Sequence, residues 1–144
     1  MCIRDRLIVL DTNVLVSALL KRDGNPTTIL KNVLEGGIRL AIDERIFEEY
    51  TRVLHRPRLN IPPDQADSIL RFIAYSALWV KCKPVEFQQN LINDPGDLPF
   101  GEVAICSHAE ALITGNLKHF LFMSHTGIKV LLPKGFLEKY RHTS

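Results

Sequence analysis

The chain lacks a long hydrophobic run, and its first apolar run covers only residues 7–10. A helix that crosses a membrane needs about 18 to 20 apolar residues, and a secretory signal needs a longer apolar stretch than this one. We therefore expect neither a membrane span nor a signal sequence. The expected protein is soluble and cytoplasmic.

Cysteine is scarce, with three residues far apart at Cys2, Cys82 and Cys106. Their spacing matches no metal-ligand motif, and an odd number argues against a framework of disulfides. We expect reduced cysteines, with Cys106 as a small residue of the core.

A strong net charge is missing as well, since the formal value is only +2. That value does not by itself indicate a nucleic-acid partner. Basic residues gather at 52–58 and again at 129–142. Because most surface charges simply face solvent, these two clusters are only candidates for a phosphate-contacting face.

The sequence does contain a regular alternation of short apolar runs and amphipathic stretches, within a length of 144 residues that suits one domain. The apolar runs predict strands at residues 7–11, 38–42, 79–82, 111–114 and 128–132. The stretches between them predict helices. This order predicts an α/β fold with a mostly parallel five-stranded sheet and right-handed crossovers.

We assign residues 7–141 to this single domain and residues 1–6, which show no periodicity, to a disordered or non-native tail. Within the domain we expect Phe72 and Trp79 in the core rather than as platforms on which bases stack. Glu102 falls opposite the apolar stripe of its helix, which predicts that it faces solvent.

Polar side chains recur where the predicted strands end. Asp11 follows the first strand, and Asn116 follows the fourth. Asp94 and Asp97 precede the helix that leads into the fourth strand. Because the carboxyl ends of parallel strands share one edge of a sheet, these side chains can lie close together.

Two neighbouring glutamates lie on the helix that begins at Asp43. At about 100° per residue, Glu48 falls opposite the apolar stripe and is expected in solvent. Glu49 falls on the flank of that stripe, half-shielded and directed along the sheet surface. Glu49 is therefore the glutamate that can meet the acids at the strand ends.

Carboxylates that meet in one crevice repel each other unless a cation joins them. Oxygen ligands favour hard cations such as Mg²⁺ or Mn²⁺, which activate water and neutralise a phosphodiester. The pattern predicts metal-assisted phosphodiester hydrolysis. Each acid also has a plain structural alternative, with Asp11 and Asp97 as helix caps and Asp94 as a turn residue.

Four segments together resemble the PIN-domain ribonucleases, in the branch related to the VapC toxins of toxin–antitoxin pairs. The matching segments are residues 10–19, 49–57, 94–100 and 112–120. The resemblance implies a three-layer α/β/α sandwich, Mg²⁺ or Mn²⁺, and cleavage of single-stranded RNA. It also implies a homodimer and inhibition by a partner antitoxin.

The same resemblance implies that Asp11, Glu49 and Asp97 are the catalytic metal ligands, with Asp94 as an accessory ligand. Many relatives have an aspartate where this chain has Asn116. An amide can still bind a metal through its oxygen, but it adds no charge. A second ion would bind more weakly, which favours a one-metal mechanism or reduced activity.

Further residues of the matching segments have implied supporting roles. Asn13 and Thr114 would orient a carboxylate or a water. Arg56, Lys118 and His119 are candidates for contacts with RNA.

Two other functions stay open. The Asp-x-Asn after the first strand is similar to the Asp-x-Asp of haloacid-dehalogenase-like phosphatases, although the second acid and a convincing downstream lysine motif are missing. The chain also fits a PIN-like RNA- or protein-binding module that kept the fold and lost activity, with Asn116 as the lost ligand.

Overall fold

The computed structural model describes residues 6–143. Cys2 and residues 1–5 of the expected tail lie outside the described residues. Arg6, predicted to belong to that tail, instead opens the first strand, where it pairs with Ile38. Its guanidinium also forms an ion pair with Glu110 at 2.7 Å.

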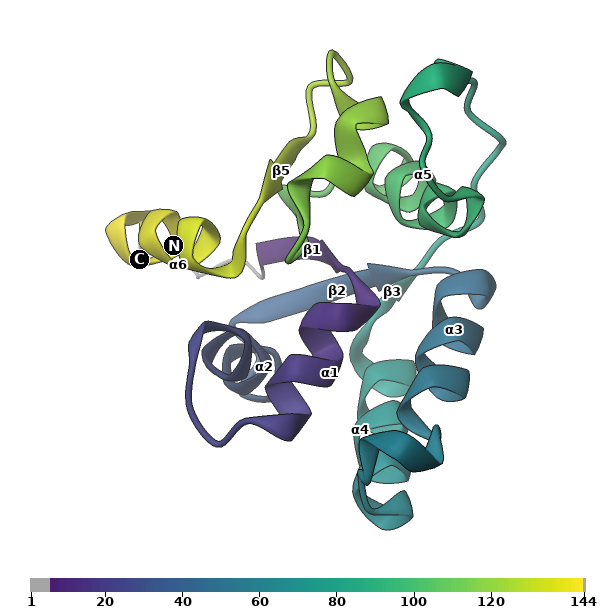
Figure 1. The fold of residues 1–144 in the computed structure, drawn as a ribbon. Coiled ribbons are helices and arrows are strands. Elements are labelled where there is room, and N and C mark those ends of the chain that lie inside the picture. Colours follow the sequence, from purple (N-terminus) through teal and green to yellow (C-terminus); the bar gives the residue numbers. More distant parts are fainter. Residues whose placement is uncertain (1–5, 144) are drawn as a thin grey trace.

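Five parallel strands form one sheet in the order β3-β2-β1-β4-β5 (Figure 1). They are β1 (Arg6–Leu10), β2 (Ile38–Ile42), β3 (Leu78–Trp79), β4 (Ala111–Ile113) and β5 (Lys129–Leu131). The predicted five-stranded parallel sheet is confirmed. The third strand is shorter than predicted, because its partner β2 ends at Ile42 and leaves residues 81–82 no backbone to pair with.

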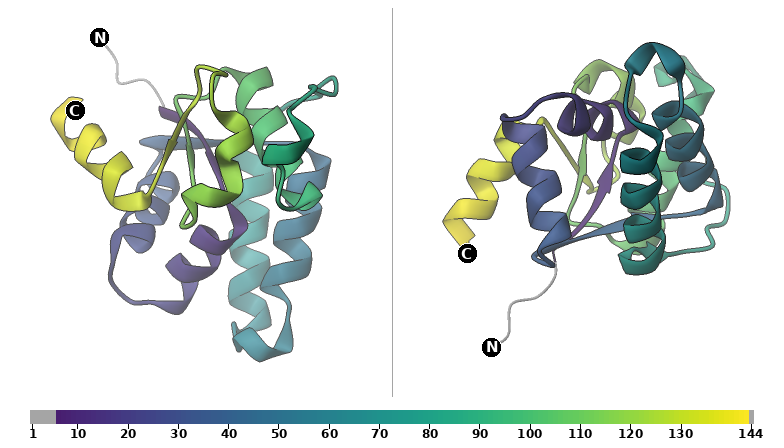
Figure 2. Two further views of the ribbon diagram at one scale, coloured as in Figure 1. Left: turned by 45° about the horizontal axis from the view of Figure 1, so that its top comes forward. Right: turned by 90° about the horizontal axis from the view of Figure 1, so that it is seen from below.

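Helices cover both faces of the sheet. The α-helices are α1 (Thr12–Leu20), α2 (Asn25–Leu34), α3 (Glu44–Leu54), α4 (Pro63–Ser76), α5 (Leu98–Ser107) and α6 (Pro133–Thr143). Short 3₁₀ helices are η1 (Pro57–Leu59), η2 (Gln89–Leu91), η3 (Pro95–Asp97) and η4 (Leu117–Met123). Helices α1 to α4 lie on one face, and α5 and η4 lie on the other (Figures 1 and 2). This arrangement is the expected three-layer α/β/α sandwich.

The central strands are buried on both faces, which explains their uninterrupted apolar sequence. Ile8, Val9 and Leu10 of β1 are at most 1% exposed, and β4 is equally buried. The chain changes from apolar to polar where these strands end, at Asp11 after β1 and at Thr114 after β4. The carboxyl edge of the sheet is thereby the polar edge.

Three predictions about burial were wrong. Glu102 is only 7% exposed, because the guanidinium of Arg45 and the backbone N–H of Val85, both distant in the sequence, contact its carboxylate. Trp79 is 41% exposed, because β3 is an edge strand. Cys106 is half-buried in the last turn of α5.

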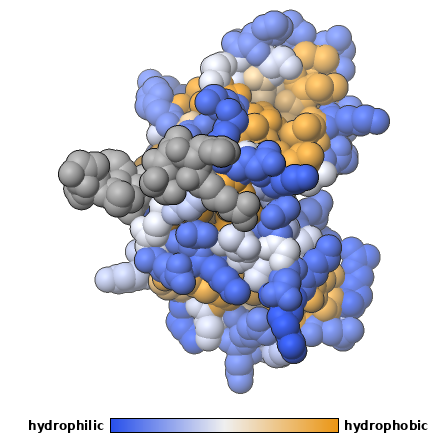
Figure 3. All heavy atoms as spheres, turned by 90° about the vertical axis from the view of Figure 1, so that its left-hand side faces the viewer, coloured by the Kyte–Doolittle hydropathy of each residue, from blue (hydrophilic) through white to orange (hydrophobic). Residues whose placement is uncertain are grey.

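One surface region is apolar. Figure 3 shows hydrophobic side chains gathered in the upper part of the face it presents. A groove in this part of the molecule is lined by residues of η4 and the following strand, including Leu117 and Leu121, which are 43% and 50% exposed. Among the helices of residues 6–143, none is long and apolar enough to cross a membrane.

Gly101 tests the packing between α5 and η4. A Cβ at this position would lie 2.7 Å from both Phe122 Cε2 and Met123 Sδ. We expect Gly101→Ala to lower the free energy of unfolding by about 1–3 kcal/mol through overpacking, as measured by urea unfolding. Gly135→Ala in α6 is the control, because no described atom lies within 4 Å of an added Cβ there. Unchanged stability of Gly101→Ala would contradict the close approach.

Candidate active site

A cavity of about 170 Å³ lies at the carboxyl edge of the sheet, next to the ends of β1 and β4. Four separate stretches of the chain line it, so only the fold brings them together. The lining residues are Asp11, Thr12, Asn13, Glu49, Asp94, Gly96, Asp97, Asn116 and His119. All five predicted metal ligands are thus in one cavity.

Hydrogen bonds of both its side chain and its backbone hold Asp11 in this cavity. Its side chain makes no capping hydrogen bond to α1, although it occupies the N-cap position. Instead, Asp11 Oδ2 accepts a hydrogen bond of 2.8 Å from the hydroxyl of Thr114, which is fully buried. The Asp11 backbone N–H donates to the Ile113 carbonyl at 2.9 Å. These bonds tie Asp11 to the end of the neighbouring strand β4.

Tyr50 secures the same position from α3. Its ring is fully buried, and its hydroxyl donates to the carbonyl of Leu10, the residue before Asp11, at 2.5 Å. Burial, together with the charges of Asp11 and Glu49, raises the pKa of Tyr50 well above its ordinary value. The hydroxyl therefore stays protonated and remains a donor.

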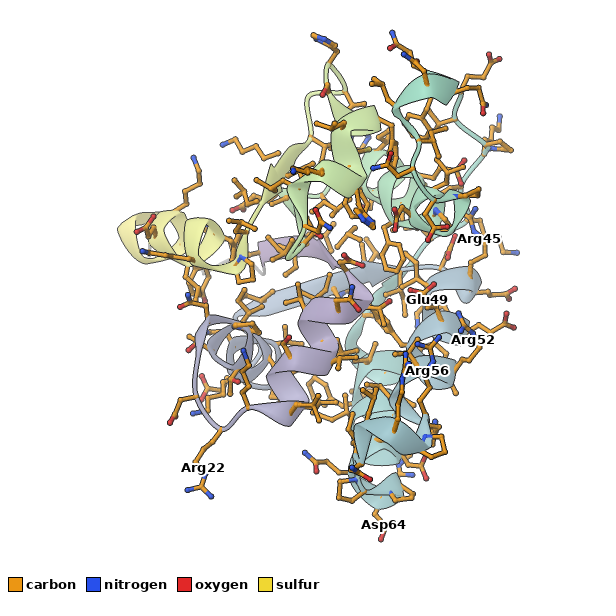
Figure 4. All side chains as sticks on the ribbon, viewed as in Figure 1. Arg22, Arg45, Glu49, Arg52, Arg56 and Asp64 are labelled. Carbon is orange, nitrogen blue, oxygen red and sulfur yellow. The ribbon has the colours of Figure 1, made fainter. Side chains whose placement is uncertain are left out.

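Glu49 enters the cavity from α3 and is half-buried, whereas Glu48 is exposed, as their positions on the helix predict. One Glu49 oxygen accepts a hydrogen bond from the Thr12 hydroxyl. The other oxygen lies 3.7 Å from the guanidinium of Arg52 (Figure 4). The carboxylate is thereby held from two sides.

Asp97 ends η3 directly before α5, and its side chain makes no capping hydrogen bond. Its Oδ2 is buried and has no hydrogen-bond partner within the described chain. The ring Nδ1 of His119 lies 3.3 Å from this oxygen, but not in hydrogen-bond geometry. The site thus contains a carboxylate oxygen that is shielded from water and incompletely satisfied.

Burial and like charge disfavour ionisation in this cavity. Burial, then the charges of Asp11 and Asp94, raise the pKa of Asp97 to about 6, against the opposing effect of His119. Burial also raises the pKa of Asp11, and the charge of Glu49 adds to the effect, although the Thr114 hydrogen bond lowers it. A positive charge added to the cavity would reduce this cost of ionisation.

Asp94 and Asn116 line the cavity but also build local turns. Asp94 Oδ1 accepts from the backbone N–H of Gly96 at 2.9 Å, and Asn116 Oδ1 accepts from that of Lys118 at 3.2 Å. Each side chain retains acceptor capacity in addition to its turn bond. The turn interpretation and the ligand interpretation are compatible.

Of the predicted supporting and RNA-contacting residues, some line the cavity or contact its residues and others do not. Thr114 contacts Asp11 directly, as the supporting role requires, and Asn13 is exposed at the rim of the cavity. His119 lines the cavity, but Arg56 and Lys118 do not. The roles of Thr12 and Tyr50 were not predicted, because a threonine at the start of a helix indicates a cap and a tyrosine in an apolar stripe indicates a core residue.

A hard divalent cation fits these residues. Within the described part of the chain, no three carboxylate, imidazole or thiol groups form a ready-made ligand set. Mg²⁺ usually binds through one or two carboxylates and keeps several waters, so a complete protein cage is not required. The buried Asp97 Oδ2, which has no hydrogen-bond partner in the described chain and shares a cavity with Asp11, suits this mode, since a bound ion would offset the unfavourable ionisation of Asp97.

Comparisons with known proteins found a matching family model, a relative in sequence and a solved structure of similar fold. A family model described as PIN domain matches residues 7–118. The uncharacterized protein MJ1680 of Methanocaldococcus jannaschii is 30% identical over 142 residues, covering 92% of this chain and 90% of the relative. A chain in the crystal structure of VapBC2 from Rickettsia felis, bound to a DNA fragment from their promoter, matches with a TM-score of 0.56. That match has 18% identity and covers 86% of this chain and 96% of the other.

The raised pKa of Asp97 predicts a pH-dependent stability of the metal-free protein. In the folded state the carboxyl keeps its proton up to about pH 6, whereas in the unfolded state it loses the proton near about pH 4. Stability therefore falls as the pH rises between these values, and the loss persists at higher pH. Asp97→Asn cannot ionise and therefore avoids this loss of stability. Because solvent partly screens the charge of Asp97, we expect the variant to gain only about 1 kcal/mol in free energy of unfolding near pH 8, which raises Tm by about 3 °C.

Thermal unfolding in EDTA followed by circular dichroism measures this gain. The gain should vanish near about pH 4, where the native carboxyl is protonated. Asp64→Asn, on the exposed first turn of α4, is the control and should give no gain at either pH. A lower Tm for Asp97→Asn at the higher pH would contradict the unfavourable ionisation of Asp97.

Proposed function

The chain belongs to the PIN domain family, and on that premise we propose that it is a metal-dependent endoribonuclease that cleaves single-stranded RNA. One observation carries the proposal: Asp97 buries an oxygen that has no hydrogen-bond partner in the described chain, in a cavity that it shares with Asp11 and Glu49. Burying like charges together is unfavourable unless a cation joins them. A divalent ion would supply the positive charge that such a cavity is suited to bind, and the bound ion would in turn attract a phosphodiester.

The residues have separable roles in this proposal. Asp11 and Asp97 would hold Mg²⁺ or Mn²⁺, with Asp94 and Asn116 as accessory ligands. Such an ion, when bound, activates a water and neutralises the phosphodiester. Glu49, held by Thr12, is placed at the cavity to orient the attacking water and accept its proton.

We further propose that the nuclease is the toxin of a toxin–antitoxin pair and acts as a homodimer. The first part is supported by the similarity of fold to VapBC2 of Rickettsia felis. The second part is supported by the exposed apolar groove that includes Leu117 and Leu121, since contiguous apolar surface marks interaction sites (Figure 3).

A non-catalytic binding module is the second candidate, and one observation favours it. Asn116 adds no charge and already accepts a hydrogen bond from the backbone N–H of Lys118. The phosphatase alternative has less support, because the position of its second acid is Asn13, which is exposed. Release of inorganic phosphate from small phosphoesters would favour the phosphatase.

The two neighbouring glutamates provide a matched test of catalysis. We expect Glu49→Gln to reduce the rate of RNA cleavage on the order of 100-fold, because it removes a cavity carboxylate. Glu48→Gln, one residue away and exposed, should retain the native rate within about twofold. The assay is cleavage of a labelled single-stranded RNA with Mg²⁺ or Mn²⁺, resolved on a gel. Equal rates for the two variants would refute the role of Glu49.

Metal binding can be measured without catalysis. Isothermal titration calorimetry of the metal-free protein with Mn²⁺ should show one binding event. Asp97→Asn should weaken the affinity for Mn²⁺ by at least about tenfold. Asp64→Asn should bind as the native protein does. Native Mn²⁺ affinity in Asp97→Asn would exclude Asp97 as a ligand. Mn²⁺ binding without any RNA cleavage would favour the binding module.

A further inference from the structure

A larger cavity, of about 550 Å³, lies at the same edge of the sheet and has no part in the cleavage described above. Residues 43–45, at the start of α3, form one side of it. Residues 79–82, at the end of β3 and just after it, form the other. The cavity is therefore next to the end of β2, the strand that neighbours β1.

The indole of Trp79 is fixed in place at this cavity. Its Nε1 donates a hydrogen bond of 2.9 Å to the carbonyl of Ala74. Its ring contacts that of Phe47, with 5.3 Å between the ring centroids and 50° between the planes. Yet Trp79 remains 41% exposed. A rigid, partly open aromatic ring is the platform on which proteins stack nucleic-acid bases.

The guanidinium of Arg45 is fixed at the same cavity. Its Nε and Nη2 donate to Asp43 Oδ2 at 2.9 and 2.7 Å, and its Nη1 donates to Glu102 Oε1 at 2.7 Å. Glu102 is held in turn by the backbone N–H of Val85 at 3.1 Å. A guanidinium has five N–H groups, so two remain for a ligand after these three bonds. The buried Glu102, whose position the helix pattern does not predict, thus holds the guanidinium of Arg45 in place.

The charges that line the cavity cancel. Asp43 and Glu44 are acidic, and Arg45 and Lys81 are basic. Such a lining favours an uncharged planar ring with polar edges over a phosphate group. A nucleobase has this chemistry.

The position of Arg45 relates this cavity to the candidate active site. Arg45, Glu49, Arg52 and Arg56 follow one another along α3 and just beyond its end (Figure 4). The spacing of four and three residues places Arg45, Glu49 and Arg52 on one side of the helix, and Arg56 follows just beyond its last turn. Arg45 and Glu49 are one turn apart, about 6 Å along the axis, which an extended nucleotide can span. Arg52 and Arg56 continue the row on the other side of Glu49.

We propose that this cavity binds the base of a nucleotide next to the cleaved phosphodiester, stacked on Trp79 and hydrogen-bonded by Arg45. The backbone of the RNA then passes Glu49 toward Arg52 and Arg56. This inference rests on the proposed function, because it assigns the cavity to the RNA that is cut.

Trp79 is the only tryptophan in the chain, so its fluorescence reports directly on this cavity. The unmodified full chain is titrated in EDTA, where no metal-dependent cleavage occurs, with single-stranded hexanucleotides of adenylate and of uridylate. We expect saturable quenching with at least one of them. Absence of any fluorescence change at RNA concentrations that saturate binding, measured by anisotropy of a labelled hexanucleotide, would overturn the proposal.

Variants test the same contact by affinity. Trp79→Ala should weaken binding of the labelled hexanucleotide by about tenfold, and Trp79→Phe should recover most of the loss, because a base also stacks on phenylalanine. Tyr75→Ala is the control, since Tyr75 is 90% exposed on α4 and does not line the cavity. Native affinity in Trp79→Ala would also overturn the proposal.

The outcome separates this inference from the proposed function. If the protein cleaves RNA with Mn²⁺ but Trp79 does not respond, the base-binding cavity is refuted and the nuclease stands. If Trp79 fluorescence is quenched but no RNA is ever cleaved, the cavity stands and the nuclease is refuted. The fluorescence titration needs no variant, so a folding defect in Trp79→Ala leaves the test intact.

Discussion

Two carboxylates that lie near each other and away from water are the constraint on which this structure depends. The side chains of Asp11 and Asp97 line one cavity at the carboxyl edge of the sheet, and burial, then the charges of Asp11 and Asp94, raise the pKa of Asp97. A protein built only for stability would place an apolar or paired group there. Retaining acids at this position makes sense if the folded chain is completed by a cation, and the surrounding bonds hold the acids ready for it.

The rest of the fold supplies those bonds. Thr114, from the end of β4, fixes the Asp11 carboxylate, and Tyr50, from α3, fixes the backbone just before it. Thr12 joins the start of α1 to Glu49. One helix thus contributes a buried tyrosine to the scaffold, a carboxylate to the cavity and, on the side that carries this carboxylate, a row of arginines. In this interpretation α3 organises both the chemistry and the binding of the substrate.

The sequence predicted the parts of this site that follow from local periodicity. Asp11 stands where a buried strand ends, and the helical period of α3 separates Glu49 from Glu48. The same reasoning failed for Glu102 and Trp79, because their burial depends on partners distant in the sequence. Arg45 of α3 covers the carboxylate of Glu102, and the strand order leaves β3 at an edge. Single-helix and single-strand patterns contain neither fact.

The most direct test of the central claim is to locate the ion. Crystals of the protein soaked in MnCl₂ would be measured at a wavelength where manganese scatters anomalously. The account predicts an anomalous peak in the cavity, within about 2.3 Å of carboxylate oxygens of both Asp11 and Asp97. A manganese-saturated crystal with no peak there, or with Asp97 Oδ2 bonded only to a protein group, would contradict it.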